Sequence, residues 1–293
     1  MKILKTCFAL ALMAAGTVNC FAGELLLKSG DNLAFLGDSI TQFGAGSPGG
    51  YVKLVVSGLD ANGVKVEPVF AGISGHKSND MLARVDRDVL SKKPNVMTLS
   101  CGVNDVWHGE RGVPLDKYKE NITAIVDKVQ AAGVKPVILT STMINEDQPN
   151  PNNQKLAAYN EFLRTFAKER NLPLADLNTQ MQDAIKKAKE TNAAKPNRGN
   201  YLTSDGVHMA PQGDQMMAEG VLRAMGLDDA QMAKAKAAWL ETPASTKIQL
   251  QVSKMVSLKD YNKLGEAAVK EKLSINEYLD REMGKSIDAM LAK

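Results

Sequence analysis

Four short blocks of the chain hold residue types that together can carry out acyl transfer. They are Gly37-Asp38-Ser39-Ile40-Thr41, Ala71-Gly72-Ile73-Ser74-Gly75-His76, Cys101-Gly102-Val103-Asn104-Asp105 and Ser204-Asp205-Gly206-Val207-His208. A serine hydroxyl is a poor nucleophile unless a neighbouring base takes its proton. His208, one of three histidines, has a carboxylate, that of Asp205, three residues before it and in the same block. Ser39, His208 and Asp205 are therefore the candidate nucleophile, base and acid.

Acyl transfer also needs hydrogen-bond donors directed at the oxyanion of the tetrahedral intermediate. The backbone amides of Ser39 and Gly75 and the side-chain amide of Asn104 are the candidates, and a glycine lets the backbone approach a substrate closely. Each block also has a simpler, structural interpretation. These are a helix cap at Ser39, a strand-end turn at Asn104-Asp105, and a loop turn at Asp205-Gly206 that leaves His208 in solvent. The occurrence of all four blocks in this order favours a catalytic site.

Short apolar segments alternate with longer amphipathic ones, as is typical of a parallel sheet covered by helices on both faces. We expect strands at 32–36, 64–70, 95–100, 136–140 and 172–176, and helices at 51–59, 79–90, 115–132, 153–170, 177–190 and 212–225. Right-handed crossovers then give a three-layer sandwich. Ligands of such sheets bind beyond the carboxyl ends of the strands. Three of the four blocks follow expected strands directly.

The four blocks resemble the SGNH hydrolases, a branch of the GDSL esterases and lipases, over about residues 32–225. The resemblance implies a flavodoxin-like α/β/α sandwich with a five-stranded parallel sheet, and ester hydrolysis through an acyl-enzyme without metal or other cofactor. It implies Ser39 as nucleophile, an oxyanion hole of Ser39, Gly75 and Asn104, and Asp205 with His208 as the acid and base. The first two blocks look most like secreted bacterial members that remove acetyl groups from carbohydrates.

The second block departs from the family pattern. Many relatives have Asn early in it and Asp or Glu after its glycine, where this chain has Ala71 and His76. His76 and His108 closely follow the two expected oxyanion residues, and with Trp107 they are candidate contacts to a sugar. The alternative is that they are exposed loop residues without a role. No metal site is expected from His76, His108 and Asp205, because no short-spaced pair of ligands supports one.

Residues 1–22 read as a secretory signal peptide. Two lysines precede an apolar run over 7–15 and a small-residue exit that ends at Ala22. The run is too short to cross a membrane. The residues before Cys20 do not suit lipid attachment, so a lipoprotein is not expected. Cleavage would leave a nearly neutral chain with Cys101 as its one thiol, in a secreted or periplasmic location.

The remaining chain divides by pattern into an expected hydrolase domain at 23–226 and a mainly helical extension at 227–293. The extension is expected to hold helices at 228–240, 258–272 and 274–291 and a strand at 247–256, with a Ser274/Glu277 capping box. Packing on the hydrolase domain, self-association and docking elsewhere remain open roles for it, and the oligomeric state is open. No second apolar stretch follows residues 7–15, so no membrane-spanning helix is expected.

Composition and loops narrow the function classes. The 36 Lys+Arg against 33 Asp+Glu residues give no basic surface for nucleic acid. A small ester or a glycan ester is the expected substrate. The competing interpretations are a lipase, lysophospholipase or thioesterase, and a catalytically inactive carbohydrate-binding protein. The loops at 142–153 and 191–203 are candidates for substrate specificity because of their length, and they lack the large apolar stretch that a long acyl chain requires.

Overall fold

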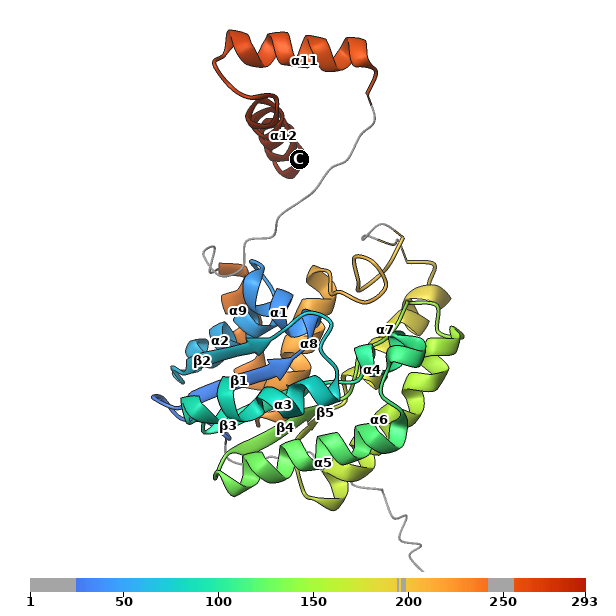
Figure 1. Ribbon diagram of the computed structural model, residues 1–293. Coiled ribbons are helices and arrows are strands. Elements are labelled where there is room, and N and C mark those ends of the chain that lie inside the picture. Colours follow the sequence, from blue (N-terminus) through green and yellow to red (C-terminus); the bar gives the residue numbers. More distant parts are fainter. Residues whose placement is uncertain (1–24, 194, 196–198, 242–255) are drawn as a thin grey trace, which may run out of the picture. The chain divides into compact units, whose positions relative to one another are not determined.

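A five-stranded parallel sheet in the order β2-β1-β3-β4-β5 lies at the centre of the larger part of the protein (Figure 1). The strands are β1 (Asn32–Gly37), β2 (Glu67–Gly72), β3 (Val96–Ser100), β4 (Lys135–Leu139) and β5 (Leu174–Ala175). The inner strands are almost wholly apolar because helices cover both faces of the sheet. The expected α/β fold with a five-stranded parallel sheet is confirmed.

The computed structural model describes residues 25–193, 195, 199–241 and 256–293. The chain divides into two compact units, residues 1–248 and 249–293. The expected signal peptide at 1–22 lies outside the described residues, as does nearly all of the strand expected at 247–256. No described helix has the length and apolar character needed to cross a membrane.

Two helical layers enclose the sheet. One consists of α1 (Ser39–Gly46), α2 (Tyr51–Ala61), α8 (Pro211–Ala224) and α9 (Asp229–Glu241), with α7 (Leu177–Glu190) beside α8. The other consists of α3 (Ser78–Asp88), α4 (Val103–Trp107), α5 (Leu115–Ala131) and α6 (Pro151–Glu169). The chain runs outwards from β1 to β2 and then in the opposite direction through β3, β4 and β5. The strand order therefore reverses between β1 and β3, where ligands of such sheets bind.

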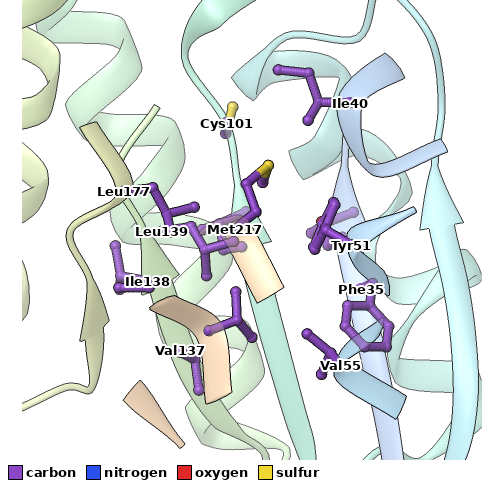
Figure 2. Packing of buried hydrophobic residues seen from close by; sticks show 14 of the residues in the cluster. Phe35, Ile40, Tyr51, Val55, Cys101, Val137, Ile138, Leu139, Leu177 and Met217 are labelled. Carbon is purple, nitrogen blue, oxygen red and sulfur yellow. The ribbon is translucent and has the colours of Figure 1, made fainter. Parts of the chain in front are cut away.

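The core fills the space between sheet and helices (Figure 2). Phe35 of β1 and Val137 of β4 lie opposite Val55 of α2 and Met217 of α8, and all four side chains are fully buried. In helices the apolar positions recur every three or four residues, so one face is buried. This packing holds the carboxyl ends of β1 and β3 in place.

The stretch after β1 is a helix, α1, although no helix was expected between the strand at 32–36 and the helix at 51–59. Helix α1 begins at Ser39 because the Asp38 carboxylate accepts the Ile40 amide at 2.9 Å, the usual action of an N-cap. Strand β2 begins at Glu67, later than the expected residue 64, because Val64 closes the end of α2: its amide donates to the carbonyl of Leu59.

Helix α9 packs on the catalytic unit, whereas a division after residue 226 placed it in the extension. Met232, Ala235 and Trp239 form its buried face. The indole nitrogen of Trp239 donates to the carbonyl of Leu54 on α2 at 2.8 Å. The catalytic unit thus includes one helix more than the sequence pattern suggested.

The second unit contains α11 (Leu258–Lys270) and α12 (Ile275–Leu291). Ser274 accepts the Glu277 amide, and the Glu277 carboxylate accepts the Ser274 amide at 2.8 Å. The expected capping box is confirmed.

Candidate active site

Ser39, His208 and Asp205 lie in hydrogen-bond contact. The Nε2 atom of His208 is 2.9 Å from the hydroxyl oxygen of Ser39, and its Nδ1 atom is 2.7 Å from Oδ2 of Asp205. Ser39 is the first residue of α1, directly beyond β1, and the other two residues lie on the loop that leads into α8. A neutral imidazole with its proton on Nδ1 donates to Asp205 and accepts the serine proton at Nε2. This geometry suits nucleophilic catalysis by serine.

Asp205 is held by its own loop. Its Oδ1 atom accepts hydrogen bonds from the amides of Val207 and His208 at 3.0 and 2.8 Å. The turn formed by residues 205–208 has a φ of +98° at Gly206. Burial alone would raise the pKa of Asp205. The hydrogen bonds from the His208 side chain and from the two amides outweigh this effect, so the pKa lies below its ordinary value. The carboxylate stays ionised and keeps the imidazole oriented.

Asp38 is a buried carboxylate beside the serine, and the sequence analysis assigned it no role. Its Oδ1 atom accepts the Ile40 amide, and its Oδ2 atom lies 3.3 Å from the side-chain nitrogen of Asn104. The pKa of Asp38 is raised to about 6, because the effects of burial and of the neighbouring Asp105 outweigh the lowering effects of the Ile40 amide and His208. Its position immediately before Ser39 was the one available signal.

Asn104, in α4, contacts both Asp38, which precedes Ser39, and His76, which follows Gly75. Besides its contact with Asp38, its side-chain nitrogen donates to the carbonyl of His76 at 3.2 Å. Its Oδ1 atom is 3.2 Å from Nε2 of His108. His108 therefore holds the oxygen of the Asn104 side chain, and the N–H groups are directed towards Asp38 and the carbonyl of His76.

Gly75 lies in the turn beyond β2, at a φ of +77°. A Cβ atom built there would meet nothing within 4 Å, so the backbone conformation, more than a lack of space, requires glycine. The turn is attached to α1, because the amide and hydroxyl of Ser74 both donate to the side-chain oxygen of Gln42, at 2.8 and 2.7 Å.

Three candidate donors thus lie in the neighbouring segments that follow β1, β2 and β3: the amides of Ser39 and Gly75 and the side chain of Asn104. Among the residues that the structure describes, the amides of Ser39 and Gly75 donate to no acceptor. The amide of Ser39 also stands at the N-terminus of α1, where the helix dipole favours negative charge. Together with Asn104, they can stabilise an oxyanion.

The three residues expected to contact a sugar have different surroundings. The Nδ1 atom of His76 accepts from Nε of Arg84 at 3.0 Å, and burial together with the charge of Arg84 lowers the pKa of His76. His108 contacts Asn104, and Trp107 is 46% exposed at the end of α4. His76, His108 and Asp205 each contact a different partner and do not come together as a metal-binding group.

Arg84 connects the ends of the first two strands and was not found from the sequence. It is 3% exposed, and its guanidinium donates to the carbonyls of Gly37 and Ala71 at 2.9 and 2.8 Å. Gly37 is the first residue of the serine block and Ala71 is the first residue of the glycine block, so one side chain bonds to the start of both.

An aromatic ring borders the imidazole of His208. The ring of Phe43 lies 4.9 Å from that of His208, centroid to centroid, and is 47% exposed. Phe43 is four residues after Ser39 on α1, so both face the same side of the helix. The sequence analysis missed it because α1 was not expected.

A family model described as GDSL-like Lipase/Acylhydrolase matches residues 35–216. The chain belongs to this family. The enzyme is a carboxylic ester hydrolase of the SGNH type, as the sequence pattern predicted. The recognition of the family and of the reaction class is confirmed.

Two of the relatives of this hydrolase are acetylxylan esterases. It is 28% identical over 223 residues to an acetylxylan esterase of Geobacillus stearothermophilus, covering 69% of this chain and 97% of that one. A solved acetyl xylan esterase matches with a TM-score of 0.60 and 33% identity, over 66% of this chain and 98% of the other. The solved Geobacillus enzyme matches with a TM-score of 0.60 and 27% identity, over 69% and 97%. Three structures of it are described as catalytic mutants, with Ser, Asp or His changed to Ala and the Asp three residues before the His.

Proposed function

We propose that this hydrolase removes O-acetyl groups from carbohydrates through an acyl-enzyme on Ser39. The observation that carries the mechanism is the unbroken contact from the serine hydroxyl through His208 to Asp205. The similarity to acetylxylan esterases supports the acetyl group and the carbohydrate. The catalytic Ser, Asp and His of the Geobacillus enzyme, with the same spacing of Asp and His, support the assignment of residues.

In the first half-reaction, Oγ of Ser39 attacks the ester carbonyl carbon while Nε2 of His208 takes the hydroxyl proton. The carbonyl oxygen becomes an oxyanion and is stabilised by the amides of Ser39 and Gly75 and the side chain of Asn104. The tetrahedral intermediate then collapses: the bond to the alcohol oxygen breaks, and that oxygen takes the proton from His208. Acetyl-Ser39 and free alcohol are the products.

In the second half-reaction, a water molecule attacks the acetyl carbonyl and gives its proton to His208. Collapse breaks the bond to Oγ of Ser39, which takes the proton back, and acetic acid leaves. In both halves His208 passes through a cationic state. The ionised Asp205 on Nδ1 and the carboxylate of Asp38 nearby stabilise that cation.

The contacts of Asn104 are compatible with an oxyanion role. Its two N–H groups already face Asp38 and the carbonyl of His76, at 3.3 and 3.2 Å. These distances exceed the usual 2.7–2.9 Å of a charge-assisted hydrogen bond. An oxyanion in front of Ser39 is therefore a stronger acceptor than either present partner, and one N–H can turn to it with little movement.

The alcohol side of the cleft lies beside Phe43. The leaving oxygen takes its proton from Nε2 of His208, so the alcohol must lie near this imidazole when the ester bond breaks. The exposed ring of Phe43 packs against the same imidazole. An aromatic face next to the leaving oxygen suits the C–H face of a sugar ring, which is apolar on one side.

The protein is proposed to act outside the cytoplasm. The basic start, short apolar run and small-residue exit of residues 1–22 support export. Mass spectrometry of the protein from the periplasm or medium is expected to find an N-terminus near residue 23. A full-length N-terminus in a protein that stays with the cytosol would contradict export.

The function is tested with purified Ser39→Ala and wild-type protein. Covalent labelling by a fluorophosphonate, acetate release from acetylated xylo-oligosaccharides, and a chain-length series of p-nitrophenyl esters are measured. Wild-type enzyme is expected to be labelled and to prefer acetate over octanoate, and the variant to lose labelling and activity while keeping its unfolding temperature. A preference for octanoate would indicate a lipase. Normal activity of Ser39→Ala would overturn the mechanism, and wild-type protein that is neither labelled nor active would indicate a binding protein.

A further inference from the structure

A buried carboxylate distant in sequence from the catalytic residues holds the loop that carries two of them. Glu146, in the segment between β4 and α6, is 5% exposed. Its carboxylate accepts four hydrogen bonds: from the amides of Tyr201, Leu202 and Thr203 at 2.6, 2.8 and 2.8 Å, and from the hydroxyl of Thr203 at 2.7 Å. No Lys, Arg or His forms an ion pair with it in the part of the chain that the structure describes. Both carboxylate oxygens of Glu146 therefore accept hydrogen bonds from one short segment, residues 201–203.

That segment continues directly into the catalytic loop. The hydroxyl of Thr203, which donates to Glu146, accepts the amide of Gly206 at 3.1 Å. The two sides of the loop pair with each other: the amide of Ser204 donates to the carbonyl of His208 at 2.8 Å, and the amide of Ala210 to that of Leu202 at 2.9 Å. The hydroxyl of Thr203 thus links Glu146 directly to the turn between Asp205 and His208.

The neighbouring residue attaches the tip of the same loop. The amide of Asn145 donates to the carbonyl of Gly206 at 2.7 Å, and Asn145 itself has a φ of +76°. A left-handed conformation at a residue other than glycine persists only where its surroundings enforce it. The pair Asn145-Glu146 therefore contacts the catalytic loop at its base and at its tip.

The hydrogen-bond pattern requires a carboxylate. Both oxygens of Glu146 face N–H donors, with Oε2 bonded to the Tyr201 amide and Oε1 to three donors from Leu202 and Thr203. A glutamine has the same shape but only one acceptor oxygen, and its NH₂ group would face an N–H. A buried donor without an acceptor is costly, so the segment would shift away.

We propose that Glu146 is a positioning residue: it sets the distance between His208 and Ser39 by fixing residues 201–203, to which the Asp205–His208 turn is bonded. The inference rests on the proposed role of His208 as the base. It also assigns the loop at 142–153 a task in catalysis, beyond the specificity expected from its length.

The test compares Glu146→Gln with Asp176→Asn. Like Glu146, Asp176 is a carboxylate that accepts backbone and side-chain hydrogen bonds. It is partly buried, caps α7, and contacts Arg164 and Thr140 instead of the loop that carries His208. With p-nitrophenyl acetate, kcat of Glu146→Gln is expected to fall about 10²-fold with little change in KM, the scale of a misplaced catalytic group. Asp176→Asn is expected to lower the unfolding temperature and leave kcat within about threefold of wild type.

A second readout follows the histidine itself. The Nδ1 proton of His208, hydrogen-bonded to Asp205, is expected to give a far-downfield proton NMR signal in wild type and Asp176→Asn. In Glu146→Gln the signal is expected to broaden or move, and labelling of Ser39 by the fluorophosphonate to slow in parallel with kcat. A folded Glu146→Gln variant with normal kcat and an unchanged signal would overturn the inference.

A third variant keeps the inference testable if Glu146→Gln does not fold. Thr203→Val removes the hydroxyl between Glu146 and the Gly206 amide and preserves the side-chain shape. Its kcat is expected to fall about tenfold, the effect of one hydrogen bond. Normal activity of this variant would contradict positioning through Thr203. Because Ser39→Ala tests the nucleophile separately, an inactive Ser39→Ala beside a normal Glu146→Gln would reject only the positioning role.

Discussion

Nε2 of His108 lies 3.2 Å from Oδ1 of Asn104, and this contact fixes which end of the Asn104 amide faces the serine. An asparagine amide can turn by half a rotation and exchange its oxygen for its nitrogen. With a proton on Nε2, His108 can bond only to the oxygen end. The N–H groups are then directed at Asp38 and the carbonyl of His76, on either side of the position expected for the oxyanion.

His108→Ala is therefore expected to reduce kcat about tenfold, equivalent to one hydrogen bond of about 1 kcal/mol. Asn104→Ala is expected to reduce it about 10²–10³-fold, as the loss of an oxyanion donor does. If His108 acts through Asn104, the double variant is no slower than Asn104→Ala alone. Steady-state kinetics on p-nitrophenyl acetate measure all three. Additive losses would mean that His108 acts independently, for example on the substrate.

Asp38→Asn is expected to change how stability depends on pH. The pKa of Asp38 is raised from 3.8 to about 6 in the folded protein. Its contribution to stability is therefore fully present below pH 3.8 and is lost as the pH rises through about 6, an effect of about 3 kcal/mol. Asparagine keeps the cap and has no charge to bury, so the variant gains stability relative to wild type between pH 4 and 7. Urea unfolding at several pH values measures this difference, and parallel pH profiles would contradict it.

Gly75→Ala and Gly133→Ala form a matched pair. Both glycines have φ near +76° with open space at the Cβ position, and Gly133 follows α5, away from the site. Each alanine is expected to cost about 1–2 kcal/mol of stability, because an L-residue is strained there. Only Gly75→Ala is expected to reduce kcat, by at least about tenfold, because its amide is a proposed oxyanion donor. Equal kcat values for the two variants would remove Gly75 from the oxyanion hole.

Arg84→Met is expected to destabilise the protein strongly. It removes the buried side-chain donor of the Ala71 carbonyl, at about 1–3 kcal/mol, and one of the two donors to the Gly37 carbonyl, which keeps the Ile73 amide at 3.1 Å. Arg87→Met is the control, because Arg87 is largely exposed and pairs only with Asp88 at the surface. It is expected to change stability by less than about 0.5 kcal/mol. Chemical denaturation measures both, and a loss below about 1 kcal/mol for Arg84→Met would show that the carbonyls find other donors.

The sequence predicted the parts of this enzyme that depend on local pattern. Buried strands are short apolar runs, and the residues directly beyond them reach the same edge of the sheet, so the residue types and positions of Ser39 and Asn104 indicated them as candidates. Asp205 and His208 were indicated by their spacing together with the other three blocks and the family resemblance. Helix α1 was missed, because its start depends on the side chain of Asp38 more than on apolar periodicity.

The residues that sequence reasoning did not find act over long separations. Glu146 contacts a segment more than fifty residues later, and Arg84 reaches back to Gly37 across the crossover from β2. A single Glu or Arg in a sequence has no pattern that indicates burial, because most such side chains are exposed. Only the folded chain shows that both are enclosed and which polar groups they satisfy.

The acid and base of this enzyme form one self-contained part. Asp205 bonds to the side chain and amide of His208 and to the amide of Val207, all within four consecutive residues. Most of the hydrogen bonds that orient the imidazole on the carboxylate therefore lie within this turn, whereas the approach of the turn to Ser39 has to be set by contacts outside it. Related chains can then exchange the surrounding loops, and with them the ester that is accepted, while the proton-transfer pair stays intact.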